Sequence, residues 1–212
     1  MKAVAIGNLN LFKIVDKTKA ETYYGCQQLW YPKQWQRLSG CGPTVATNLF
    51  FYLCHNQAPL ELEEKTNTKE NWISLMEEMW EYVTPTKRGV NTTERFYESL
   101  QTFLQAKGLE ADYRFCNVAV DKSQRPGFRE ILDFIVEALT NDSPVAFLNL
   151  CNGKVENLDR WHWVTLISLD YSEDDSCAFA SILDEGQIKR IDLALWFETT
   201  TLGGGFVYFM LE

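Results

Sequence analysis

The sequence predicts an α+β domain in which an N-terminal helical part packs on a C-terminal antiparallel β-sheet. Apolar residues recur at helical spacing in several segments of the first two thirds of the chain. Short apolar runs separated by turn-forming residues follow one another in the last third. At 212 residues the chain is expected to form one domain, covering 1–212, that buries a core without disulfides or metal.

The first predicted helix covers 43–54, where Val45, Leu49 and Leu53 recur at four-residue steps and form an apolar face. Pro43 suits its first turn, because the proline φ matches the helix and the missing N–H would have no partner there. A charged connection at 61–68 is expected to follow.

Three further helices are expected, at 69–82, 93–107 and 126–140. The segment 84–86 contains a proline that ends the first of these helices. Thr93 is expected to cap the second, and Gly108 to end it.

Strands are expected from residue 145 onward. The continuous apolar run 145–150 suits a central position in a sheet, and Asn152-Gly153 marks the turn after it. A strand with β-branched and apolar residues then begins at His162. The remaining strands are expected at 177–183, 187–193 and 206–211.

A cysteine flanked by two glycines stands at the mouth of the first helix, in Ser39-Gly40-Cys41-Gly42-Pro43-Thr44. Free backbone N–H groups and the positive end of the helix dipole favour a thiolate at this place. The two glycines are expected to leave the approach to the sulfur open. Cys41 is therefore predicted to be a nucleophile.

The five other cysteines lack this context, and no pair has the C-x-x-C spacing of a zinc or redox site. We expect these residues to pack in the interior, as free cysteines usually do. They are Cys26, Cys54, Cys116, Cys151 and Cys177.

A cysteine nucleophile needs a base, and the chain contains two histidines, His55 and His162. His55 lies at the far end of the helix that Cys41 opens, about 20 Å away at 1.5 Å per residue, and is expected to cap that helix. His162 enters a strand, where alternation would place Trp161 and Trp163 on the opposite face. His162 is predicted to share a proton with Cys41; the alternative is a buried histidine bound to a carbonyl.

A third residue should orient the imidazole. If the His162 strand turns through the polar loop 172–176 and returns as 177–183, the hairpin brings Asp184 close to His162. Asp184 is the candidate, and Glu185 is a weaker rival. The alternative is that Asp184 only opens the Asp-Glu-Gly turn.

In chain order, the glycine-flanked Cys41, the segment His162-Trp163-Val164 and the strand-end Asp184 resemble the motifs of papain-fold cysteine peptidases. The nearest branch is that of the bacteriocin-leader-processing (double-glycine) peptidases. The resemblance implies a papain-like fold and cleavage of a peptide or amide bond through a Cys-His-Asp triad and an acyl-enzyme.

The same resemblance implies a glutamine shortly before the nucleophile whose amide helps to form the oxyanion hole. Gln34, seven residues before Cys41, is the favoured candidate. Gln36 stays an alternative, because the position six residues before Cys41, common in the wider papain group, holds Trp35.

Two other functions stay open at this point. A papain-fold acyltransferase or amidase would share the first half-reaction and differ in the nucleophile that enters the cleft. A non-catalytic peptide-binding module of the same fold would use the aromatic-rich stretch 23–35 as a groove.

Composition limits the partners. The net charge is −9, and the absence of a basic stripe argues against nucleic acid or an anionic membrane as partner. A peptide or protein substrate is expected, with no cofactor and no metal. No apolar run reaches eighteen residues, so no membrane span is expected. Six cysteines and an N-terminus without a long apolar stretch favour the cytoplasm.

Overall fold

The computed structural model describes residues 1–16, 19–56 and 68–211. The charged connection predicted at 61–68 therefore lies outside the described residues except for Thr68. The helices are η1 (Leu9–Phe12), η2 (Gln28–Trp30), α1 (Gln34–Ser39), α2 (Cys41–Asn56), α3 (Lys69–Trp80), α4 (Thr93–Ala106), η3 (Lys122–Gln124), α5 (Phe128–Thr140) and α6 (Leu193–Thr199). The strands are β1 (Lys2–Ala5), β2 (Lys13–Asp16), β3 (Glu21–Tyr24), β4 (Ala111–Val118), β5 (Val145–Asn149), β6 (His162–Tyr171), β7 (Ala178–Asp184), β8 (Gln187–Asp192) and β9 (Gly204–Leu211).

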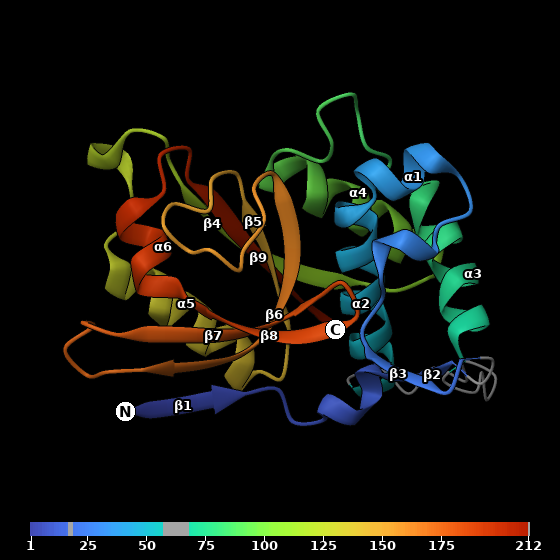
Figure 1. Cartoon of the computed structure of the whole chain (residues 1–212), viewed down its shortest axis with the longest axis horizontal. Helices are drawn as coiled ribbons and strands as arrows, with labels where there is room; N and C mark the ends of the chain where they lie inside the picture. Colours follow the sequence, from blue (N-terminus) through green and yellow to red (C-terminus); the bar gives the residue numbers. More distant parts are fainter. Residues whose placement is uncertain (17–18, 57–67, 212) are drawn as a thin grey trace.

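A seven-stranded antiparallel sheet organises the molecule. Its order is β4-β9-β5-β6-β7-β8, and β1 pairs with β6 outside this path. Figure 1 shows α2, α3 and α4 gathered on one side of β6, and α5 and α6 on the other. The predicted α+β class, with helices packed on an antiparallel sheet, is confirmed.

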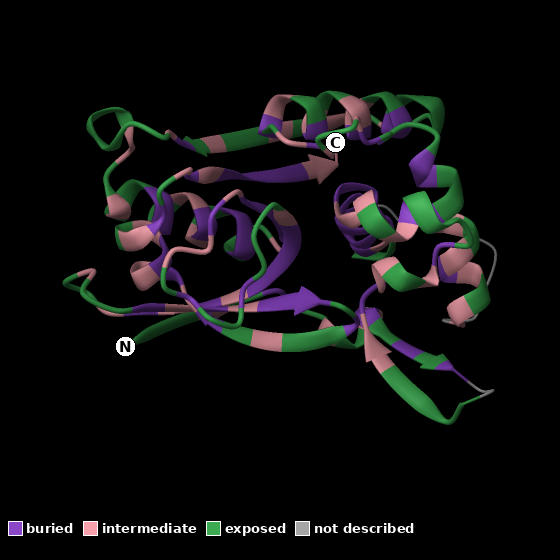
Figure 2. Ribbon diagram, turned by 45° about the horizontal axis from the view of Figure 1, so that its top comes forward, coloured by how far each residue is buried: buried purple, intermediate pink, exposed green. Residues whose placement is uncertain are grey.

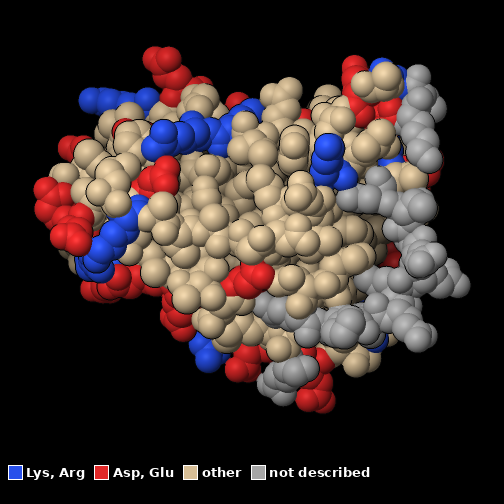
Figure 3. Space-filling model, turned by 90° about the horizontal axis from the view of Figure 1, so that it is seen from below, with Lys and Arg blue, Asp and Glu red and all other residues tan. Residues whose placement is uncertain are grey.

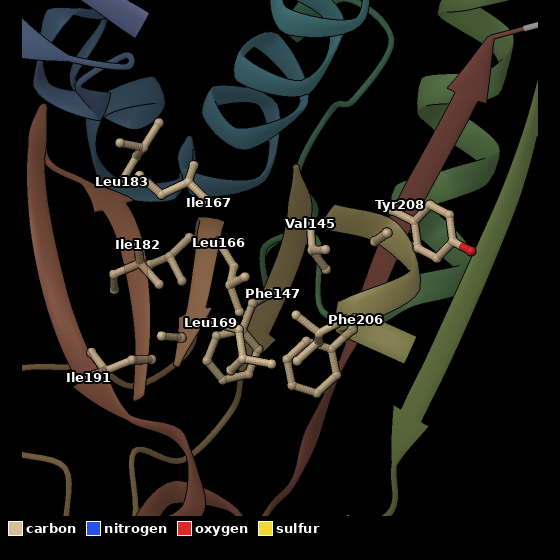
Figure 4. Packing of buried hydrophobic residues seen from close by; sticks show 14 of the residues in the cluster. Val145, Phe147, Leu166, Ile167, Leu169, Ile182, Leu183, Ile191, Phe206 and Tyr208 are labelled. Atoms are coloured by element: carbon tan, nitrogen blue, oxygen red, sulfur yellow. The ribbon is translucent and has the colours of Figure 1, made fainter. Parts of the chain in front are cut away.

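The sheet is covered on both faces, because its central strands are apolar on both. All five residues of β5 are buried. Val145 and Phe147 join the core under α5 and α6, whereas Ala146 and Leu148 join the core under α2 and α4. This is the two-residue period of a strand. Figure 4 shows the first of these cores, where the rings of Phe147 and Phe206 stack with centroids 4.7 Å apart.

Helix α2 is the central helix and extends the predicted range at both ends. Twelve of its residues are buried, from Gly42 to Cys54, so the helix is enclosed by protein on nearly all sides. It packs on β6, β5 and α3. His55 bonds the carbonyl of Phe51 through Nδ1 at 2.8 Å, in agreement with its predicted place at the helix end.

Several predicted boundaries need correction. Thr92, and not Thr93, caps α4, since its hydroxyl accepts from the Arg95 N–H at 3.2 Å. The strand predicted at 187–193 ends at Asp192, whose carboxylate caps the unpredicted helix α6 through the Leu195 N–H.

The strands β1 to β4 and the helix α1 are not predicted from the sequence. The β2–β3 pair forms a separate two-stranded sheet that extends from the main body in Figure 2, and most of its residues are exposed or half-buried. Strand β4 forms an edge of the main sheet, and most of its residues are exposed or half-buried. Such segments bury too little apolar surface to show a periodic hydrophobic pattern in the sequence.

The surface seen in Figure 3 carries uncharged side chains over much of its centre. Among its described residues, Lys and Arg side chains lie mainly toward the margin and are interspersed with acidic ones. No helix in the described ranges is both long enough and apolar enough to cross a bilayer.

Candidate active site

Cys41 is the first residue of α2, and only Gly40 separates it from the end of α1. Its side chain is half-buried and lines a cleft of about 550 Å³. The flanking glycines serve packing and do not simply keep the approach open. A Cβ at Gly42 would lie 2.8 Å from the Val90 Cγ2, and one at Gly40 would lie 2.5 Å from the Gln36 carbonyl oxygen. Two chain segments therefore pack directly against the turn that holds Cys41.

His162 is the first residue of β6, where it pairs with Asn149 of β5. The next side chain, Trp163, is buried, stacks on Phe96 and donates its indole N–H to the Val90 carbonyl at 2.5 Å. Trp161 behaves differently from the expectation. It precedes the strand with a φ of +54°, and 55% of its surface is exposed at the cleft. Only one of the two tryptophans therefore anchors the histidine strand.

Asp184 ends β7 and lies beside His162 through the predicted hairpin. Strands β6 and β7 pair in antiparallel register, with Thr165 opposite Leu183. His162 Nε2 is 2.7 Å from Asp184 Oδ1. Asp184 also opens the turn to β8, in which Glu185 and Gly186 have φ values of +52° and +73°, as a type I′ hairpin requires. The two interpretations of Asp184 are therefore compatible.

The electrostatics of His162 and Asp184 favour the charged form of each side chain. Burial by itself lowers the pKa of His162, but hydrogen bonds to Asp184 and Cys41 and their negative charges raise it to about 10. Burial raises the pKa of Asp184, and hydrogen bonds from His162 and Lys189 more than offset this, so the pKa lies below its usual value. Because Nε2 faces Asp184, the other ring nitrogen, Nδ1, is the one available to Cys41.

The structure does not bring the predicted glutamines into the cleft. Gln34 is exposed at the start of α1, and the buried Gln36 accepts the Lys33 N–H through Oε1 at 3.2 Å. Gln27 and Gln28 line the cleft instead. The Gln28 side-chain amide donates to the Arg37 carbonyl at 2.6 Å, so Gln27 is the candidate oxyanion donor of the cleft lining.

The sequence carries no signal for Gln27, because this residue lies fourteen positions before Cys41. It reaches the cleft only because the chain passes through η2 and doubles back into α1. Lys189 was also missed. Its ammonium lies 2.7 Å from Asp184 Oδ2.

One group of side chains near the cleft has the composition of a metal site. The ligand atoms of Asp159, His162 and Asp184 lie within 4.8 Å of one another. Both oxygens of Asp184 are already engaged, Oδ1 with His162 and Oδ2 with Lys189. We therefore interpret His162 and Asp184 as a hydrogen-bonded pair, with the Asp159 carboxylate nearby.

A second cysteine has an unusual environment. The hydroxyl of Thr201 donates to Cys151 Sγ at 3.2 Å, and this bond, with backbone N–H groups of Thr201 and Gly153, lowers the pKa of Cys151 to about 7. Cys151 is buried and does not line the cleft. Cys177 is exposed, contrary to the expectation that it packs inside.

No family model matches the sequence, and no curated protein matches it either. The structure is similar to the crystal structure of UfSP from C. elegans, with a TM-score of 0.54 and 10% sequence identity. The match covers 100% of this chain and 34% of that chain, so this chain spans about a third of the length of its structural neighbour. At this identity the likeness shows the fold alone, and it supports the predicted papain-like fold of this chain.

Proposed function

We propose that the protein is a cysteine peptidase that cleaves a peptide or amide bond with Cys41 as nucleophile, His162 as general base and acid, and Asp184 as the residue that orients the imidazole. The observation that carries the proposal is that Cys41, His162 and Asp184 line the same cleft, with His162 Nε2 2.7 Å from Asp184 Oδ1. Such a set in a cleft is typical of activated nucleophiles.

The reaction follows from the protonation states. The Cys41 thiolate attacks the substrate carbonyl carbon, and the carbonyl electron pair moves to oxygen. When the tetrahedral intermediate collapses, the C–N bond breaks and the His162 imidazolium gives its proton to the leaving amine. The neutral imidazole then takes a proton from water, whose oxygen attacks the thioester. Collapse of the second intermediate releases the acid and restores the thiolate and the imidazolium.

An oxyanion must be stabilised in both intermediates. We assign this role to the backbone N–H of Cys41 and the side-chain amide of Gln27, which lines the cleft. Gln34 is exposed at the start of α1 and does not line the cleft.

The cleft walls indicate the substrate. Leu29, Leu38 and Trp161 line the cleft and expose 59%, 70% and 55% of their surfaces. The lining carries charges of both signs: it includes the basic Arg37 and Arg160 and the acidic Asp159 and Glu185. A polypeptide with apolar side chains near the scissile bond fits this lining better than a strongly basic one.

The test is alkylation of the native protein by iodoacetamide across pH, with the labelled residue located by mass spectrometry. Selective labelling of Cys41 below pH 7, weakened in His162→Ala, is the expected result. Cys177 and Cys151 are internal references, one exposed and one buried with a lowered pKa. Equally slow labelling of all cysteines would contradict the catalytic assignment and favour the peptide-binding module.

An acyltransferase shares the first half-reaction with a peptidase. Trapping the thioester with a reactive acyl donor and adding water alone or a primary amine distinguishes the two, because a peptidase releases the acid in either case. The proposed location is the cytoplasm, where a catalytic thiol stays reduced.

A further inference from the structure

A lysine bonds the carboxylate oxygen of Asp184 that does not contact His162. Lys189 Nζ lies 2.7 Å from Asp184 Oδ2, while His162 Nε2 lies 2.7 Å from Oδ1. The tight turn between β7 and β8 explains the contact. Asp184 pairs with Gln187 and Ile182 pairs with Lys189, so Lys189 and Asp184 are diagonal neighbours on one face of the hairpin.

The contact matters because Asp184 is buried. Only 5% of its surface is exposed, and a buried carboxylate is costly unless it is paired and hydrogen-bonded. The imidazolium of His162 balances the thiolate of Cys41. A second cation is then needed for Asp184, and Lys189 supplies it.

We propose that Lys189 is a positioning residue of the catalytic site, whose ammonium balances the charge of Asp184 and holds the carboxylate so that Oδ1 faces His162. This inference rests on the proposed role of Cys41, His162 and Asp184. Lys189 does not line the cleft, and it acts only through Asp184.

The charged groups around His162 come from several elements. Cys41 faces it from α2 and Asp184 from β7. The cleft lining adds further charges, from α1, from the loop before β6 and from the β7–β8 turn: Arg37, Asp159, Arg160 and Glu185. Glu185 also contacts Lys189, at 3.4 Å, but its side chain is 53% exposed and this second pair is weak.

Loss of Lys189 leaves the set Cys41, His162 and Asp184 with one negative charge that no cation balances. The thiolate then forms less readily and the carboxylate is protonated more readily as the pH falls, so both changes move the acidic limb of Cys41 reactivity to higher pH. An opposite charge within about 4 to 6 Å shifts a titration by roughly one to three pH units. Lys189 is 25% exposed, so we expect about half a unit to one unit.

The experiment measures the alkylation rate of Cys41 in the full chain from pH 4 to pH 9, with the label located by mass spectrometry. Lys189→Met and Lys189→Gln are expected to react about threefold to tenfold more slowly on the acidic limb. Lys189→Arg keeps the charge and is expected to stay within about twofold of the parent. Arg190→Gln is the matched control, because it removes the neighbouring cation of β8, which pairs with Asp170 and does not line the cleft; it should also stay within about twofold.

A Lys189→Met profile that superimposes on the parent, or a Lys189→Arg profile shifted as far as Lys189→Met, would overturn the inference. If Lys189→Met does not fold, the comparison of Lys189→Gln with Lys189→Arg decides, since both retain a hydrogen-bonding head group. The proposed function fails separately, if the parent itself shows no selective labelling of Cys41.

Discussion

Replacement of Asp184 by asparagine tests the central hydrogen bond with little change in shape. The carboxylate accepts from His162 at 2.7 Å and is buried, and both features are typical of a strong charge-assisted bond. A hydrogen bond to a charged group contributes about 1.5 to 3 kcal/mol. We therefore expect kcat/KM for a peptide substrate to fall about 10- to 100-fold in Asp184→Asn.

The same variant should change the pH profile in a defined direction. Asp184 is one of two groups that raise the pKa of His162 from an ordinary value of about 6.5 to about 10, against the opposing effect of burial. Without the negative charge the imidazolium loses its proton more readily. The basic limb of kcat/KM should move to lower pH by about one to three units.

A double-mutant cycle makes the test sharper. In Asp184→Asn the ammonium of Lys189 loses its closest anion, which destabilises the fold in addition to the catalytic loss. Asp184→Asn combined with Lys189→Met restores the charge balance, so the free energy of unfolding should recover in part while kcat/KM stays low. Urea denaturation and peptide hydrolysis at several pH values provide the two readouts.

The reasoning is refuted if Asp184→Asn retains the parental pH profile and loses only stability. Asp184 would then serve the β7–β8 turn alone. Glu185→Gln is the control, because Glu185 lies in the same turn and does not contact His162.

Three further predictions follow from the same geometry. Gln27→Ala should lower kcat about 100-fold with little change in KM, whereas Gln34→Ala should match the parent in the same peptide assay. Equal losses of kcat in the two variants would contradict the assignment of Gln27 as the oxyanion donor. The pKa of His162 is raised above its value in the unfolded chain, so protonated His162 stabilises the fold fully below about pH 6.5, and this contribution is lost as the pH rises toward 10. Its upper limit is roughly 5 kcal/mol. Urea denaturation across this pH range should show the decline in stability, and His162→Ala should remove the decline. Gly42→Ala should lower the free energy of unfolding by about 1 to 3 kcal/mol, since the added methyl group would lie 2.8 Å from Val90 Cγ2; thermal unfolding measures the loss, and an unchanged midpoint would show that Val90 moves without cost.

Much of the fold was predictable wherever a segment carries its own periodic signal. The helical spacing around Val45 and Leu49 predicted α2, and the continuous apolar run of β5 predicted a central strand that is buried on both faces. The polar loop between β6 and β7 predicted the hairpin that joins His162 to Asp184. These signals are local, so the sequence alone was sufficient for them.

The edges of the sheet gave no comparable signal. Strand β4 pairs along its length with β9, which lies more than eighty residues later in the chain, and β1 pairs with β6 in the same way. Pairings of this kind depend on the partner strand and leave little trace in the edge strand's own pattern.

The sequence by itself identified the candidate triad: a cysteine at a helix start, a histidine at a strand entrance, and a carboxylate that ends the next strand. The tertiary structure decided which groups surround them. It placed Gln27 in the cleft in place of Gln34, exposed Trp161 at the cleft, and set Lys189 against Asp184. The physical reason is that a motif records neighbours along the chain, whereas charge balance and oxyanion binding depend on side chains that only the folded backbone brings together.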